Sequence, residues 1–273
     1  MAQNINNYDN NWKKVKAAEE KGLTKTAMEE VHAIYKLAQK DKIEAQQIKA
    51  CMYLIRYRNM VQENSRENNI FFVDTLIRDA KAPVKNILQS MQAEMYWQYL
   101  QNNRYKFYDR SKTNQENSTD INTWSLNKLH QTITSLYKVS LQNEVLLQST
   151  KLNGFEPIII KGENTRNLRP TLFDFLAHRS LAYFVTDEND LTKPAYRFTL
   201  HDDKILQQIL QFHIADEKPD ALLDADFIRL NFVNEYGTQP QKEKLYEAAL
   251  QHIETKYSNH PAAAEAMYIR ANM

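Results

Sequence analysis

The sequence predicts an all-α protein whose antiparallel helical hairpins are stacked side by side, with two long loops that make the stack somewhat irregular. Glycine and proline, which favour turns, number only 4 and 7 in 273 residues, about 4% of the chain against roughly 12% in an average protein. Residues 23–82 and 84–153 contain neither of them. A β-sandwich or barrel needs a turn every ~8–12 residues, so these folds are excluded. Apolar residues instead recur at helical spacing.

Short turns connect the first predicted helices. Tyr8, Trp12 and Val15 share one helical face, and Lys21-Gly22 is a typical C-terminal stop. Short turns between successive helices favour αα-hairpins. Pro83 falls at the first turn of a helix, where proline is tolerated. We expect helices near residues 8–20, 25–40, 43–60, 70–80, 83–100 and 124–140, the last opening at Trp124.

The second half is less regular. Residues 104–121 form a polar interval whose later part we expect to be a loop, and 144–171 hold two of the four glycines, with a segment at 157–160 that is compatible with extended structure. We expect two units, 8–150 and 165–273, unless the domain is continuous. Further helices are predicted near 171–185, 203–214, 222–236 and 241–257, with a linker at 187–195 and a last helix from 261.

The last hairpin resembles a tetratricopeptide (TPR) repeat. Ala249, Ile253 and Pro261 match the small–large–proline end of that pattern, although Lys256 stands where a small residue is usual. The resemblance implies a TPR-like superhelix, an α-solenoid. A helix that is apolar on two adjacent sides is sandwiched between neighbours. The two stripes here are Tyr246, Leu250, Ile253 and Tyr257, and beside them Leu245, Ala249 and His252.

The helix that starts at Pro261 has neither a glycine stop nor a polar capping helix before Met273. Solenoids need such a cap, because the last open face is apolar. Ala262, Ala266 and Met267 would be left uncovered. We therefore expect the natural protein to continue beyond Met273.

Charge and composition exclude several classes of protein. The net charge of +1 disfavours a basic nucleic-acid binder. No apolar run approaches the ~20 residues of a membrane span, and the N-terminus lacks the basic and apolar regions of a signal peptide. The single cysteine, Cys51, cannot form an internal disulfide, and its apolar helical neighbours predict a buried, inert thiol.

The sequence predicts no catalytic, cofactor or metal site. It contains no G-x-G-x-x-G, H-E-x-x-H or G-x-S-x-G motif, and none of the seven histidines has a zinc-ligand spacing. Asp202 and Asp203 fit a helix N-terminus better than metal ligation. His178 fits a half-buried hydrogen-bonding role better than that of a base. An enzyme of unrecognised type is therefore the weakest of three hypotheses; the other two, an interaction scaffold and a stand-alone binding protein, are given below.

One aromatic and basic run is the best candidate for a binding surface. Aromatic and arginine side chains are favoured at protein-contact hot spots, and the same mixture stacks sugars or single-stranded nucleic acid. Alternatively, these residues close their helix against its neighbours and anchor the following loop. The candidate residues are Tyr96, Trp97, Arg104, Tyr105, Tyr108 and Arg110.

Five segments together resemble the N-terminal helical region of large bacterial alpha-2-macroglobulin-like envelope proteins. They are 12–15 (WKKV), 21–23 (KGL), 93–99 (AEMYWQY), 103–110 (NRYKFYDR) and 169–179 (RPTLFDFLAHR). The resemblance implies an exported protein far longer than this chain, whose helical part precedes β-sandwich domains. It also implies a role as a protease trap or envelope-defence factor.

The same resemblance places any reactive thioester in a later domain, so Cys51 is not its cysteine. We therefore expect a non-catalytic protein-interaction scaffold in the periplasm or cell envelope, with the signal sequence removed from this chain. Its partner would be another protein or later domains of the same full-length chain, with no nucleic acid and no cofactor. The alternative is a stand-alone TPR-like protein that binds glycans or proteins.

Overall fold

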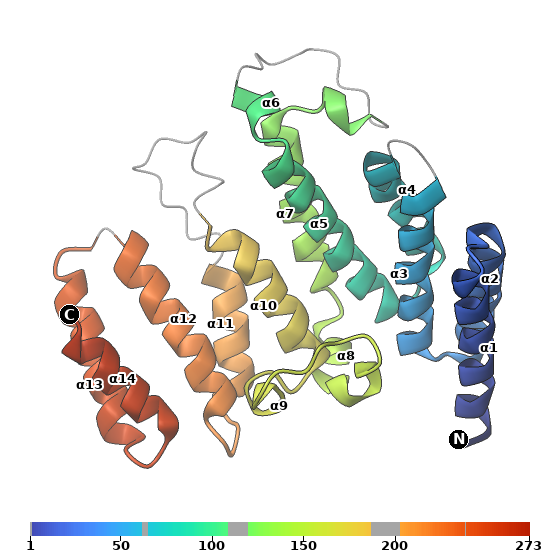
Figure 1. The fold of residues 1–273 in the computed structure, drawn as a ribbon. Helices are drawn as coiled ribbons and strands as arrows, with labels where there is room; N and C mark the ends of the chain where they lie inside the picture. Colours follow the sequence, from blue (N-terminus) through green and yellow to red (C-terminus); the bar gives the residue numbers. More distant parts are fainter. Residues whose placement is uncertain (1, 62–64, 109–119, 187–202, 238) are drawn as a thin grey trace. The chain divides into compact units, whose positions relative to one another are not determined.

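The computed structural model describes residues 2–61, 65–108, 120–186, 203–237 and 239–273, and these residues are helical apart from turns and one isolated bridge between Lys151 and Thr171 (Figure 1). Within these ranges there is no β-strand, which confirms the all-α prediction. Contacts divide the chain into two units. The first comprises Met1–Glu163 and Thr171–Ser180, and the second comprises Asn164–Pro170 and Leu181–Met273.

The helices of the first unit follow the expected order closely. The long helices of the second unit also come in the expected order. Helix α10 (Leu172–Phe184) begins in the first unit and ends in the second. The remaining helices of the first unit are α1 (Ala2–Glu20), α2 (Thr24–Asp41), α3 (Glu44–Val61), α4 (Ser65–Asp79), α5 (Val84–Asn102), α6 (Tyr105–Tyr108), η1 (Ile121–Thr123), α7 (Leu126–Ser140), α8 (Glu144–Ser149) and η2 (Leu152–Phe155). Those of the second are α9 (Thr165–Leu168), α11 (Asp203–His213), α12 (Asp220–Tyr236), α13 (Lys242–Lys256) and α14 (Pro261–Ala271).

In the first unit each long helix packs against the next one in the chain. The contacts run from α1 to α2, α3, α4 and α5 in turn, and then from α5 to α7. Because α4 connects α3 to α5 through short links, α3 and α5 run in the same direction (Figure 1). They also contact each other directly, and α3 contacts η2.

Two similar turns join the first three helices. Gly22 adopts a left-handed φ of 70°, its N–H donates to the Glu19 carbonyl, and the N–H of Leu23 donates to the Ala18 carbonyl, both at 2.9 Å. This is the Schellman ending that the sequence predicts. Lys42, at the end of α2, has a similar left-handed φ of 58° without being glycine.

The core of the first unit confirms the helical periodicity. Ala27, Val31, Ile34 and Ala38 of α2 are all buried, as their spacing predicts. A polar contact then ties α5 to the end of α7, where the buried Asn86 amide donates hydrogen bonds to the carbonyls of residues 140 and 142 at 3.0 and 2.8 Å. Satisfied buried amides of this kind fix one arrangement of the helices.

Three local expectations need correction or fall outside the described residues. Trp124 precedes its helix, because the Ser125 hydroxyl accepts the N–H of Lys128 at 3.2 Å and caps α7 from one residue later. In the segment 157–160, residues 157–159 form turns and a bend instead of an extended strand, since the N–H groups of Ile158 and Ile159 donate to the Phe155 carbonyl. Most of the expected loop at 104–121, and the linker at 187–195, lie outside the described residues.

The second unit packs α11 on α12, α12 on α13, and α13 on α14. One stripe of α13 is buried, but the predicted second stripe is not, because Leu245 is 59% exposed and His252 is also exposed. Ala262 and Ala266 were expected to be uncovered, yet both are buried in the cluster that joins α12, α13 and α14. They face back onto their own hairpin, whereas Met267 is 54% exposed.

Candidate functional site

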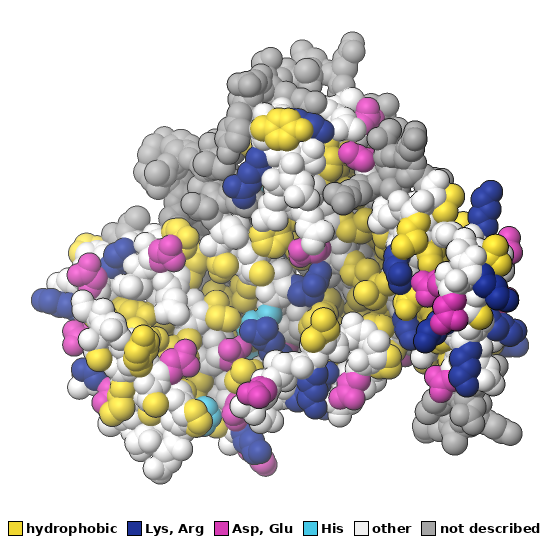
Figure 2. All heavy atoms as spheres, viewed as in Figure 1, with side chains coloured by type: hydrophobic (Ala, Val, Ile, Leu, Met, Phe, Trp, Pro, Cys, Tyr) yellow, Lys and Arg dark blue, Asp and Glu magenta, His cyan; other side chains and the backbone are white. Residues whose placement is uncertain are grey.

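A groove of about 930 Å³ lies within the first unit, between α3, the start of α4, α5, the segment that follows η2, and α10. Its apolar lining is only partly covered, and Met52 is 43% exposed. Hydrophobic side chains are visible on this face of the molecule (Figure 2). The partly exposed apolar side chains that line it are Met52, Ile55, Met91, Met95, Ile158, Ile159 and Phe175.

Two helical stripes form the long walls of this groove. On α3 the stripe runs Ile48, Met52, Ile55 and Asn59, and on α5 it runs Met91, Met95, Gln98 and Asn102. Both step by four, three and four residues, which keeps the side chains on one helical face. Since α3 and α5 run in the same direction, the apolar side chains gather toward one end and the amides toward the other.

A fixed ion pair completes one side of the groove. Nη2 of Arg179 in α10 lies 3.7 Å from the Glu94 carboxylate, and its Nε donates to the Ser90 hydroxyl at 3.1 Å. The Tyr137 hydroxyl donates to the same carboxylate at 3.1 Å. The Arg179 guanidinium also lies 5.8 Å from the centre of the Phe175 ring. These contacts hold both charged groups in the wall.

The first two residues of the predicted binding run belong to α5. Tyr96 is only 3% exposed, and its ring stacks on Trp124 with the centroids 5.4 Å apart and an interplanar angle of 17°. Burial, with a smaller contribution from Asp74, raises the pKa of the Tyr96 phenol. Trp97 is half-buried. Tyr96 therefore anchors α5 against the segment before α7.

The other predicted residues lie at and beyond the end of α5. Arg104 is exposed, and Tyr105 is 68% exposed in the first turn of α6. Tyr108 is the last residue of α6, and Arg110 lies outside the described residues. The structure does not bring Tyr96 and Tyr105 to a common surface, because one is internal and the other faces solvent.

Sequence reasoning missed the groove. Met91 and Met95 continue the apolar stripe that Val84 and Leu88 begin on α5, so their spacing predicts core positions. Met91 and Met95 are partly exposed, whereas Val84 and Leu88 are buried. The local period is the same for all of these residues, and no sequence signal separates the covered part of the stripe from the open part.

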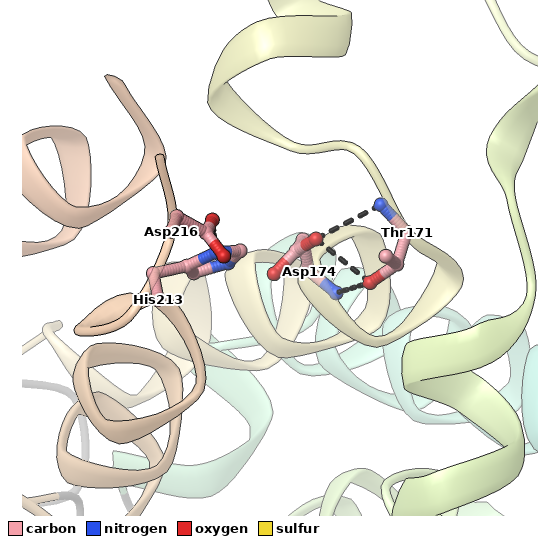
Figure 3. A network of polar contacts seen from close by, with 4 residues as sticks. All are labelled: Thr171, Asp174, His213 and Asp216. Atoms are coloured by element: carbon pink, nitrogen blue, oxygen red, sulfur yellow. Dashed lines mark hydrogen bonds and ion pairs between the residues drawn. The ribbon is translucent and has the colours of Figure 1, made fainter. Parts of the chain in front are cut away.

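Polar pairs elsewhere have local structural roles (Figure 3). In the first unit Thr171 donates to the buried Asp174 carboxylate through its N–H at 2.9 Å and its hydroxyl at 2.7 Å, while the Asp174 N–H returns a 3.4 Å contact to that hydroxyl. This is a reciprocal capping box that starts α10. In the second unit Nδ1 of the buried His213 lies 2.7 Å from an Asp216 oxygen, just after α11 ends.

The remaining residues singled out by the sequence can also be located. Cys51 is fully buried, and burial raises the pKa of its thiol from 9.0 to about 12, which confirms a buried thiol. His178 is buried, rather than half-buried, in α10. Asp203 is the first residue of α11, and Asp202 lies outside the described residues. Among the described residues, no three histidine, cysteine, aspartate or glutamate side chains are grouped as metal ligands would be.

Comparison of the chain with protein-family models, curated proteins and solved structures found no match. In the described part of the chain, none of the helices has the length and apolar character needed to cross a membrane.

Proposed function

We propose that this chain is a non-catalytic protein-interaction scaffold, with the groove of the first unit as its binding surface. The observation that carries the proposal is the groove itself, about 930 Å³ in volume and lined by methionine and isoleucine side chains that stay partly exposed. Ligand sites are typically concave and lined mainly by apolar side chains, with a few polar groups among them. Methionine adapts its shape to different partners, because its side chain is unbranched and polarizable.

The ligand of the groove is a peptide segment of a protein. The volume is near the upper limit for small-molecule pockets, which range from roughly 300 to 1,000 Å³. An amide side chain both donates and accepts hydrogen bonds, so Asn102, and the Gln98 oxygen beside the Nε2 that donates to Glu94, suit the main chain of a bound segment. The apolar end of the groove, around Met91 and Met95, suits its anchoring side chains.

The proposal includes a TPR-like architecture. The packing of consecutive long helices against one another within each unit supports it. So does the α13–α14 hairpin, in which Ile253 is buried and Pro261 opens the second helix. Proline at the first helical position is preorganised for that role.

We also propose that the scaffold belongs to a larger, exported macroglobulin-like protein of the periplasm or cell envelope. The resemblance of segments 12–15, 21–23, 93–99, 103–110 and 169–179 supports this assignment. Under it, the groove binds another envelope protein or a later domain of the same full-length chain. The buried thiol of Cys51 takes no part in binding.

A stand-alone glycan- or protein-binding role is the second candidate. Tyr105, 68% exposed beside the exposed Arg104, favours it, because such side chains stack on sugars and contact proteins. Glycan-array binding that disappears in Tyr105→Ala supports this role. Silence of the wild-type chain across a broad array contradicts glycan binding.

Peptide selection tests the groove. Random peptides displayed on phage are selected against the full chain, and their affinities are then measured for Met91→Glu and for the control Met267→Glu. Glutamate and methionine have similar helix propensities, and both methionines lie on helices with at least part of the side chain exposed. We expect Met91→Glu to weaken binding about tenfold or more, with little effect of the control.

Labelled methionine methyl groups provide an independent measurement. Selected peptides should shift the methyl resonances of Met52, Met91 and Met95 and leave that of Met267 in place. Peptides whose affinity is equal for both glutamate variants, or that perturb Met267 instead, contradict the assignment of the groove.

A further inference from the structure

Two arginines beside α12 have buried donors that the chain does not satisfy. Arg166 lies in α9, and Arg169 follows that helix directly. Helix α9 packs against α12 within the second unit. Both Nε and Nη2 of Arg166 are buried, and among the described residues none accepts a hydrogen bond from either atom. The Nε of Arg169 is likewise buried without a hydrogen-bond acceptor in the described part of the chain.

Among the described residues, the positive charge at this place exceeds the negative charge that contacts it, although the side chains of Arg169 and Asp224 are 40% and 21% exposed. Asp224 of α12 lies 3.5 Å from Nε of Arg169, within ion-pair range but beyond a good hydrogen bond. Arg166 and Arg169 carry two positive charges, since arginine stays protonated in proteins, and Asp224 supplies one negative charge. One further negative charge would balance the group.

Burying an unsatisfied charged donor costs its full desolvation penalty, which is larger than that of a neutral group. Arg166 as a whole is only half-buried, so an acceptor from outside the chain reaches this guanidinium edge once the side chains that cover Nε and Nη2 move aside. In arginine the N–H of Nε and one N–H of Nη2 point in the same direction along one edge of the guanidinium plane. That edge holds two oxygens of one carboxylate or phosphate group in parallel hydrogen bonds.

We propose that Arg166, with Arg169 beside it, binds an oxyanion, either a carboxylate or a phosphate group. The two unsatisfied atoms of Arg166 are the pair that forms this bidentate edge. A singly charged carboxylate would balance the surplus charge, and a phosphate would exceed it slightly. The site lies in the second unit and does not depend on the proposed groove.

Titration of the full chain tests the site. Sodium phosphate and sodium acetate are added separately at constant ionic strength, with sodium chloride as the control salt. The Nε–H resonance of Arg166 should shift and saturate with at least one of the two anions. In Arg166→Gln, binding should weaken about tenfold or more, as expected for loss of a charged bidentate donor.

The control variant is Arg229→Gln in α12. The Nε of Arg229 already donates to Asp226 at 2.8 Å, so its loss should change anion binding less than about twofold. If Arg166→Gln does not fold, Arg166→Lys keeps the positive charge but lacks the planar fork. This variant should also bind about tenfold more weakly, because a point charge cannot replace two parallel hydrogen bonds.

The melting temperature of Arg166→Met is a second readout. It should rise if Arg166 lacks an acceptor in the anion-free chain, and fall if Arg166 stabilises that chain. In buffer without oxyanions, Arg166→Met should raise the melting temperature, because it removes a buried charge without an acceptor. It should also abolish the rise that the anion produces in the wild-type chain.

Saturation by phosphate alone, by acetate alone or by both identifies the anion class. Two results overturn the proposal. One is a shift that never saturates or that sodium chloride reproduces. The other is a lower melting temperature for Arg166→Met in anion-free buffer.

Discussion

Replacing Tyr96 by alanine tests whether the aromatic and basic run closes the helical layer or is free to bind a partner. The Tyr96 ring is 3% exposed and stacks on Trp124 at 5.4 Å. Truncating a buried aromatic side chain to alanine costs about 3–5 kcal/mol through lost burial and the cavity that remains. We expect Tyr96→Ala to lower the free energy of unfolding of the first unit by this amount.

The matched control is Tyr105→Ala, nine residues further along the same run. Its side chain is 68% exposed, so we expect a change within about 0.5 kcal/mol. The chain's three tryptophans, Trp12, Trp97 and Trp124, all belong to the first unit. Tryptophan fluorescence during urea unfolding therefore reports that unit, and the midpoint and slope together give the free energy.

Equal and small losses in both variants would refute the reasoning, because they would mean that Tyr96 contributes no more packing than an exposed residue. A large loss of unfolding free energy in Tyr105→Ala would also refute it, because Tyr105 would then contribute to the packing of the core. The expected contrast assigns Tyr96 to the core and leaves Tyr105 as the residue of this pair available to a partner.

Two further predictions concern the left-handed turns and the buried thiol. A left-handed backbone conformation costs a non-glycine residue about 1–2 kcal/mol relative to glycine. Part of this gain is offset, because glycine gives the unfolded chain more conformational entropy to lose on folding. Urea unfolding should therefore show Gly22→Ala to be less stable, and Lys42→Gly more stable, by about 0.5–1 kcal/mol each. The pKa of Cys51 is raised from 9.0 to about 12, so its contribution to stability is complete below pH 9 and is lost as the pH rises toward 12. The free energy of unfolding of Cys51→Ala should therefore fall less steeply than that of the wild type between pH 9 and 12. A thiol reagent at pH 8 should modify the wild-type chain only when it unfolds. Rapid modification of the folded chain, or an equal pH slope in the variant, would contradict this reasoning.

The sequence by itself determined the helices. Scarce glycine and proline leave few places to turn, and each turn that Gly22 or a short polar link provides ends one helix and starts the next. The α2 stripe that contains Val31 and Ile34 is buried as its period predicts, because burial of one apolar face is the main source of helix stability in a folded chain. These are local properties, which neighbouring residues decide.

Tertiary structure alone decided which apolar stripes are covered and which donors are satisfied. Met91 and Val84 lie on one stripe of α5, yet only Val84 is buried. Leu245 continues the apolar pattern of α13 but faces solvent, and the buried edge of Arg166 depends on its environment beside α12. Helical spacing is set within a few residues of the chain, whereas exposure and hydrogen bonding depend on helices far away in the sequence. The candidate groove and the oxyanion site therefore emerge only when these helices pack.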